Sequence, residues 1–172
     1  MPIFRLNHAV LYVRDLERSV AFYRDVLGFE TVMTMGGAAA FIQAPGSTND
    51  HDLGLFQIGP GAGPSEAGRH TVGLYHLAWE VDTLAELARV RDALLQAGAL
   101  VGASDHVTTK ALYAQDPDGL EFEVSWLLPA DLITDEVRSA AMRIRPLDLE
   151  REIERYGART RGGVGVSVPV LG

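Results

Sequence analysis

The chain has 172 residues, of which 47% are hydrophobic and 22% charged, and its formal net charge is −8. This is an ordinary globular composition, and the length suits one domain or two small fused repeats. The acidic balance and the lack of a Lys/Arg cluster argue against nucleic acid and anionic membranes as partners. Because cysteine is absent, disulfides, thiolate metal sites and cysteine nucleophiles are excluded, which fits a cytoplasmic location. No apolar run approaches the roughly 18 residues that span a bilayer.

The first sixty residues predict one strand, one helix and three further strands. Residues 6–13 have the composition of a strand. Apolar residues spaced by four, three and four positions predict a helix over 16–27, with Asp15 as its N-cap and Gly28 as its stop. Strands are then expected over 29–35, 38–43 and 53–58. A first β-α-β-β-β module therefore covers 4–60.

The same order is predicted again after a linker at 59–69, which is rich in Gly and Pro. Thr83 and Glu86 fit a capping box at the start of a second helix. The buried side of that helix is expected to consist of Leu84, Leu87, Leu94 and Leu95. The following strands are predicted over 99–102, 110–115 and 120–127. An Asp-Pro-Asp-Gly hairpin turn at 116–119 joins the last two strands, and the second module covers 72–128.

The remaining residues, 129–172, form a C-terminal tail with a different pattern. Helices are predicted over 131–142 and 147–156, and the segment 157–172 is Gly-rich, basic at first and then apolar. Three arrangements of this end stay open, because it can pack on the domain, reach a partner subunit or be disordered. It contains no motif that indicates chemistry.

Two histidines occupy equivalent positions in this near-repeat. His8 opens the first strand, and His76 opens the corresponding strand 68 residues later. Glu123 lies between Phe122 and Val124 in the last strand, where a buried carboxylate needs a charge partner or strong hydrogen bonds. Two imidazoles and one carboxylate form the facial set of non-haem Fe(II) sites, which leaves other positions open for substrate and dioxygen. We therefore predict a metal held by His8, His76 and Glu123, although a hydrogen-bonded carboxylate at the sheet rim is the simpler alternative.

These features resemble the vicinal oxygen chelate superfamily, which includes glyoxalase I, bleomycin-binding proteins, fosfomycin-resistance enzymes and extradiol dioxygenases. The resemblance covers about residues 4–128. It rests on the two module copies, on His8 and His76, on LERSVAFYRDVLGF at 16–29 and on DPDGLEFE at 116–123. It implies an α+β fold of two βαβββ modules that form an open cup around one metal, and a homodimer. The reaction is less specified, because this fold hosts several chemistries.

The second half most resembles the extradiol dioxygenases. His106 lies 17 residues before Glu123 and Tyr113 lies 10 before it, matching a pocket His and Tyr of that group. The resemblance implies that His106 is the acid–base group and that Tyr113 hydrogen-bonds a substrate oxygen. The expected reaction is cleavage of a small catecholic aromatic with Fe(II) and O2; Mn, Ni, Co and Zn suit the same ligands. Without the resemblance, His106 is equally consistent with a residue of a polar loop, and Tyr113 is consistent with a core residue.

Two other functions stay open. Glyoxalase-type lyases or isomerases, which use Ni, Zn or Co, add a fourth ligand on the last strand of the first module. Gln57 is the residue there that can ligate, through its amide oxygen, whereas the neighbouring Phe56 cannot. The third function is that of a metal-free small-molecule (antibiotic) binding protein. His51 and His70 have no convincing spacing for a pocket role, and we expect both to be exposed.

Overall fold

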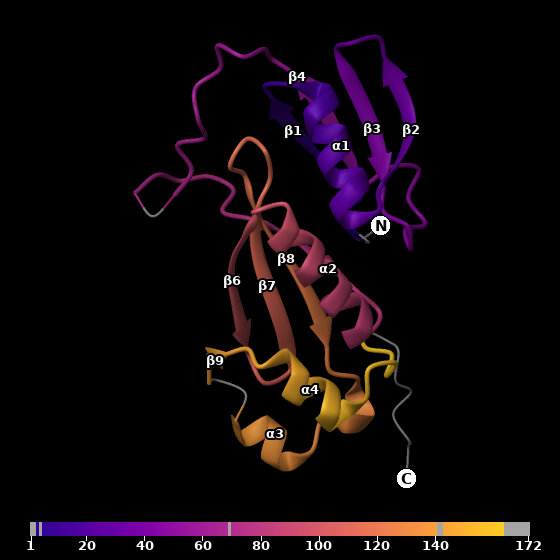
Figure 1. Cartoon of the computed structure of the whole chain (residues 1–172), viewed down its shortest axis with the longest axis vertical. Coiled ribbons are helices and arrows are strands. Elements are labelled where there is room, and N and C mark those ends of the chain that lie inside the picture. Colours follow the sequence, from indigo (N-terminus) through magenta and orange to yellow (C-terminus); the bar gives the residue numbers. More distant parts are fainter. Residues whose placement is uncertain (1–2, 4, 69, 141–142, 164–172) are drawn as a thin grey trace. The chain divides into compact units, whose positions relative to one another are not determined.

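The computed structural model describes residues 3, 5–68, 70–140 and 143–163. Its contacts divide the chain into unit 1 (residues 1–66 and 116–120) and unit 2 (residues 67–115 and 121–172). The order β-α-β-β-β occurs twice along the chain (Figure 1), so the fold is of the predicted mixed α+β class. Within the described ranges, no helix combines the length and hydropathy that crossing a membrane requires.

Unit 1 is a four-stranded sheet covered by one helix. Its elements are β1 (Ala9–Val13), α1 (Leu16–Leu27), β2 (Glu30–Met35), β3 (Ala39–Gln43) and β4 (Leu53–Gln57). The strand order is β1-β4-β3-β2, with β1 parallel to β4 and the other pairs antiparallel. As predicted, the Asp15 side chain accepts the Arg18 N–H at the start of α1, and Gly28 (φ 78°) ends it. The core between α1 and the sheet includes Leu11, Val13, Ile42, Leu53 and Leu55.

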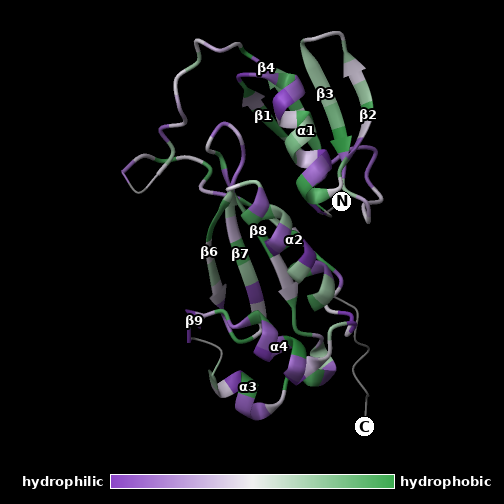
Figure 2. Ribbon diagram, in the orientation of Figure 1, coloured by the Kyte–Doolittle hydropathy of each residue, from purple (hydrophilic) through white to green (hydrophobic). Residues whose placement is uncertain are grey.

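Unit 2 has a five-stranded sheet and carries the C-terminal elements. These are β5 (Leu77–Glu80), α2 (Leu84–Gln96), β6 (Leu100–Asp105), β7 (Thr109–Gln115), β8 (Glu121–Leu127), a 3-10 turn (Ala130–Leu132), α3 (Asp135–Ala140), β9 (Arg145–Pro146) and α4 (Leu149–Tyr156). The strand order is β5-β8-β7-β6-β9. Thr83 caps α2 by accepting the Glu86 N–H. Figure 2 shows polar and apolar residues interleaved along α1 and α2, as expected for helices with one buried side.

Several predicted boundaries were wrong. The first strand begins at Ala9 and not at residue 6, so His8 lies immediately before β1. Leu95 is 58% exposed, and Val90 takes its place in the core, because Leu95 lies about 100° around the helix from the buried Leu94. The strand predicted over 99–102 runs from Leu100 to Asp105, because its pairing with β7 continues to Asp105 and β9 pairs with the same end.

The predicted start of the helix over 131–142 was also wrong. A 3-10 turn occupies Ala130–Leu132, and α3 begins only at Asp135, where the Thr134 hydroxyl accepts the Val137 N–H. Residue 142, the end of that predicted helix, and the apolar run from residue 164 lie outside the described residues.

Residues 143–163 pack on unit 2, and we call them the C-terminal strap. β9 pairs with β6 at Ser104 and Asp105, and α4 packs against α2. Beyond α4, the indole Nε1 of Trp126 donates to the Thr160 carbonyl (3.2 Å), and the Gly163 N–H donates to the Leu127 carbonyl (3.0 Å). Of the three arrangements left open for the tail, packing on the domain is the one that these residues adopt.

Gly162 allows the strap to approach the sheet closely. A Cβ atom at this position would lie 2.2 Å from the Leu127 carbonyl oxygen and 2.3 Å from Nε1 of Trp126. We therefore expect Gly162→Ala to lower the free energy of unfolding by about 1–3 kcal/mol, because the backbone and indole must move apart. Urea unfolding measures this, with Gly61→Ala as the control, since nothing lies within 4 Å of a Cβ there. Equal stability of the two variants would contradict the close packing.

Candidate functional site

Strand alternation divides the unit 2 sheet into two faces. Phe122, Val124 and Trp126 of β8 are buried on the face that α2 and the strap cover. Glu123 points to the opposite face, which we call the site face. Tyr113 of β7 lies directly opposite Glu123 in the antiparallel register, so both side chains are on the site face.

His76 and Glu123 form a pair on the site face. Nε2 of His76 lies 3.5 Å from Oε2 of Glu123, with the side chains 26% and 15% exposed. This separation is longer than a good hydrogen bond. It approaches the roughly 3.0–3.4 Å between two ligand atoms that each lie about 2.1 Å from one ion. Nδ1 of His76 is buried and has no hydrogen-bond partner among the described residues. The pair therefore fits a divalent metal by donor chemistry and spacing.

A cluster of His106, Tyr113 and Ser104 adjoins this pair. Nε2 of His106 lies 2.8 Å from Oγ of Ser104 and 3.1 Å from the Tyr113 hydroxyl. The His76 and Tyr113 rings are 6.1 Å apart. Burial raises the pKa of Tyr113, the Glu123 carboxylate adds to the rise, and the contact with Ser104 opposes it. The Tyr113 phenol therefore keeps its proton at neutral pH and remains a hydrogen-bond donor.

The histidines of unit 1, His8 and His51, lie just before two strands of a separate sheet, β1 and β4. His8 is exposed, and its Nδ1 lies 2.7 Å from Oδ1 of Asn7. The prediction that His51 is exposed was wrong, because its side chain is only 16% exposed. Its ring lies 4.5 Å from that of His8 and 5.0 Å from that of Phe41, and these two rings cover it. The sequence signal that we missed is the position of His51 two residues before a buried strand. His70 is exposed, as predicted.

The structure thus brings His76, His106, Tyr113 and Glu123 together and leaves His8 on unit 1. Among the described ranges, no three His, Asp or Glu side chains form a ready-made metal cluster. The role of His8 as a third ligand stays a prediction, as do the roles of the other four residues.

Gln57, the residue considered as a fourth ligand, has another contact. Its amide oxygen accepts the backbone N–H of Leu16 at 2.8 Å, one of the free N–H groups in the first turn of α1. This hydrogen bond uses the oxygen atom that ligation requires. The structure therefore gives Gln57 a capping role at the start of α1.

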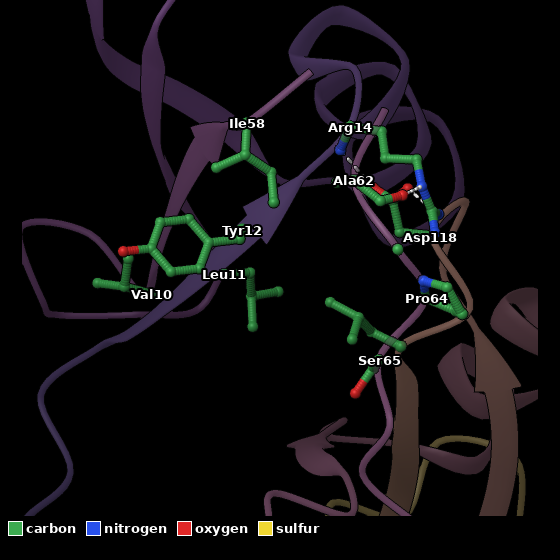
Figure 3. Close-up of a pocket in the computed structure, with 11 residues that line it drawn as sticks. Val10, Leu11, Tyr12, Arg14, Ile58, Ala62, Pro64, Ser65 and Asp118 are labelled. Carbon is green, nitrogen blue, oxygen red and sulfur yellow. Dashed lines mark hydrogen bonds and ion pairs between the residues drawn. The ribbon is translucent and has the colours of Figure 1, made fainter. Parts of the chain in front are cut away.

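Unit 1 contains a cavity of about 280 Å³. Figure 3 shows Val10, Tyr12 and Ile58 at its wall and the guanidinium of Arg14 pointing at Asp118. Arg14 Nη1 and Asp118 Oδ1 are 2.8 Å apart, so the two charges neutralise one another. None of the five predicted site residues lines this cavity, and it offers no unpaired charge for chemistry.

Comparison with known proteins agrees with the fold. Residues 5–124 match the family model described as the Glyoxalase/Bleomycin resistance protein/Dioxygenase superfamily. Because this match covers more than half of the chain, the protein belongs to that superfamily, whose members bind divalent metals.

Two curated relatives and one solved structure illustrate the range of the superfamily. The catechol-2,3-dioxygenase of Bacillus subtilis (strain 168) is 34% identical over 153 residues, which are 88% of this chain and 52% of the relative. The lactoylglutathione lyase of Salmonella typhimurium is 31% identical over 130 residues, which are 70% of this chain and 90% of the relative. A glyoxylase/bleomycin resistance protein/dioxygenase domain from Frankia sp. EAN1pec has a TM-score of 0.60 and 23% identity, covering 72% of this chain and 92% of that one. The chain spans about half the length of the dioxygenase that it matches.

Proposed function

We propose that this chain is a metal-dependent extradiol-type dioxygenase that cleaves a small catecholic aromatic with Fe(II) and O2. The observation that carries the proposal is the His106, Tyr113 and Ser104 cluster beside the His76–Glu123 pair on one sheet face. The likeness to a catechol-2,3-dioxygenase over 88% of the chain supports it. The proposal includes a homodimer, the assembly that the superfamily resemblance implies.

In this proposal His8, His76 and Glu123 hold the metal. Fe(II) supplies a Lewis acid that lowers the pKa of catechol oxygens bound to it. The protein must then orient the substrate, keep a proton on one group and accept a proton at another.

The cluster beside the ligands performs these tasks. The Tyr113 hydroxyl keeps its proton, so it donates a hydrogen bond to a substrate oxygen as negative charge develops there. Nε2 of His106, 3.1 Å from that hydroxyl, accepts the proton that leaves a catechol oxygen and later returns it. Ser104 Oγ, 2.8 Å from the same nitrogen, holds the imidazole ring in this orientation.

A glyoxalase-type lyase or isomerase is the second candidate, and the likeness to a lactoylglutathione lyase over 70% of the chain favours it. That chemistry was expected to use Gln57 as a fourth ligand. The Gln57 oxygen already accepts the Leu16 N–H, which ranks this candidate second.

Metal analysis of anaerobically purified protein, combined with oxygen uptake on a panel of catechols, tests the proposal. Bound iron with catechol-dependent uptake and a yellow ring-cleaved product is the expected result. Stoichiometric Ni, Co or Zn without oxygen uptake would point to the lyase or isomerase. Protein that takes up no metal even after reconstitution would be a small-molecule binding protein.

Replacing His106 by Gln tests the acid–base role. We expect kcat to fall by about 10²–10⁴-fold while the iron content is unchanged, because the imidazole moves a proton but does not ligate the metal. Steady-state oxygen uptake and metal analysis on the same preparation measure both quantities. His70→Gln is the matched control, since His70 is exposed and outside the site. A His106→Gln enzyme with full kcat would reject His106 as the acid–base group.

A further inference from the structure

A buried ion-pair cluster lies on the face of the unit 2 sheet opposite the site face, which we call the reverse face. Nζ of Lys110 is 2.5 Å from Oδ1 of Asp105 and 2.8 Å from Oε2 of Glu152, and the Lys110 side chain is 1% exposed. Glu152 belongs to α4 of the C-terminal strap and is itself buried. The ring of Tyr156, also on α4, lies 5.8 Å from the ammonium. Because a buried charge requires partners, this cluster ties the strap to the sheet.

Asp105 also holds the turn that contains His106. The same Oδ1 that contacts Lys110 accepts the backbone N–H of Val107 at 2.7 Å. Val107 has φ 71°, a left-handed conformation that a β-branched residue rarely adopts. The His106 N–H donates to the Thr109 carbonyl (2.9 Å), which closes the turn between β6 and β7. Such an unfavourable backbone conformation persists only where surrounding contacts impose it, and strained residues of this kind cluster at functional sites.

Strand alternation links these contacts to the site. Asp105 lies between Ser104 and His106 in the chain, with its side chain on the reverse face and theirs on the site face. The strap contacts this part of the sheet in two ways. Glu152 forms an ion pair with Lys110, and β9 pairs with Ser104 and Asp105 of β6. A shift of this backbone would therefore move the His106 ring away from the Tyr113 hydroxyl.

We propose that Glu152 is a positioning residue for His106. Glu152 forms an ion pair with Lys110, and Lys110 forms one with Asp105. Asp105 accepts the Val107 N–H and so fixes the backbone beside the His106 imidazole. This inference rests on the proposed function, in which His106 moves the proton. It gives the strap a role in catalysis that acts from the reverse face of the sheet, through Glu152. A misplacement of a catalytic group by about 1 Å is enough to lower a rate about 100-fold.

Glu152→Ala and Glu150→Ala in the full chain separate positioning from general attachment of α4. Glu150 lies on the same helix, is exposed and pairs with Arg91. In Glu152→Ala we expect amide hydrogen exchange at Val107 to accelerate about tenfold and the ring nitrogen NMR signals of His106 to shift. We also expect kcat to fall about tenfold with KM unchanged. Glu150→Ala should change none of these. Glu152→Gln should give intermediate values, because an amide oxygen can occupy the place of the carboxylate oxygen 2.8 Å from Nζ of Lys110 but carries no charge.

The amide hydrogen exchange of Val107 and the NMR signals of the His106 ring are measured without substrate. They therefore test the inference even if the chain cleaves no catechol. Unchanged Val107 exchange and His106 signals in Glu152→Ala would overturn it. So would equal changes in Glu150→Ala, since these would reflect loosening of the whole helix. Should Glu152→Ala fail to fold, Glu152→Gln is compared with Glu150→Gln, with an expected acceleration at Val107 of about threefold; no difference would again overturn the inference.

Discussion

Replacing Lys110 by Ala is expected to lower the free energy of unfolding by about 3–5 kcal/mol. The ammonium is almost fully buried and lies within 2.8 Å of a carboxylate oxygen of both Asp105 and Glu152. Its removal leaves two carboxylates close together with no cation between them and little water to screen them. Although burial opposes it, the Lys110 and Val107 hydrogen bonds hold the pKa of Asp105 below its usual value, which indicates that the native cluster favours the ionised carboxylate.

Urea unfolding of four variants tests this explanation. If the cost comes from unpaired charge, Lys110→Met with Glu152→Leu should be more stable than Lys110→Met alone, because the second change removes one isolated carboxylate. Arg91→Ala breaks the ion pair with the exposed Glu150 and should have little measurable effect, since solvent screens that pair. A Lys110→Ala protein as stable as the parent chain would show that the buried cluster does not stabilise unit 2.

Replacing Glu123 by Ala is expected to reduce metal affinity by more than about 100-fold, to the point that purified protein retains no metal. Loss of an outer contact to a metal ligand alone costs 10–100-fold, and Glu123 is predicted to be a ligand itself. Its carboxylate is 3.5 Å from Nε2 of His76, a separation that suits two ligands of one ion. Metal analysis and titration of the apoprotein measure the loss.

Two controls sharpen this measurement. Glu121→Gln removes a carboxylate on the same face of β8, two residues away, and should leave metal content unchanged. His8→Ala asks whether unit 1 contributes the third ligand, and we expect it to weaken metal binding as strongly as Glu123→Ala does. Full metal occupancy in Glu123→Ala would reject the proposed site, whereas full occupancy in His8→Ala alone would reject only the ligand from unit 1.

The local elements of this fold were predictable because their signals lie close together in the chain. Asp15 and Thr83 accept backbone N–H groups at the starts of the two long helices, as their positions indicated. The positive φ of Gly28 and Gly98 ends these helices. The alternation that placed Glu123 on the face opposite Phe122 required only the period of a strand.

The residues that surround the chemistry were less predictable. The burial of His51 depends on the rings of His8 and Phe41, which reach it from two other parts of unit 1. The capping contact of Gln57 depends on the start of α1, which lies 41 residues earlier in the chain. Neither contact leaves a period or a spacing in the sequence.

The sequence nominated His8, His76 and Glu123 by their places in the two modules, and the family resemblance added His106 and Tyr113. By itself, the sequence also determined the α+β class and the repeated β-α-β-β-β order. Hydrophobic period, caps and turns encode such features within a few residues of each other. Only the tertiary structure decided that Lys110 is buried and that Glu152, 42 residues later, is its partner. A lysine and a glutamate in a sequence are both expected at the surface. Their burial becomes favourable only when the strap brings the opposite charges together, and that depends on contacts between distant segments.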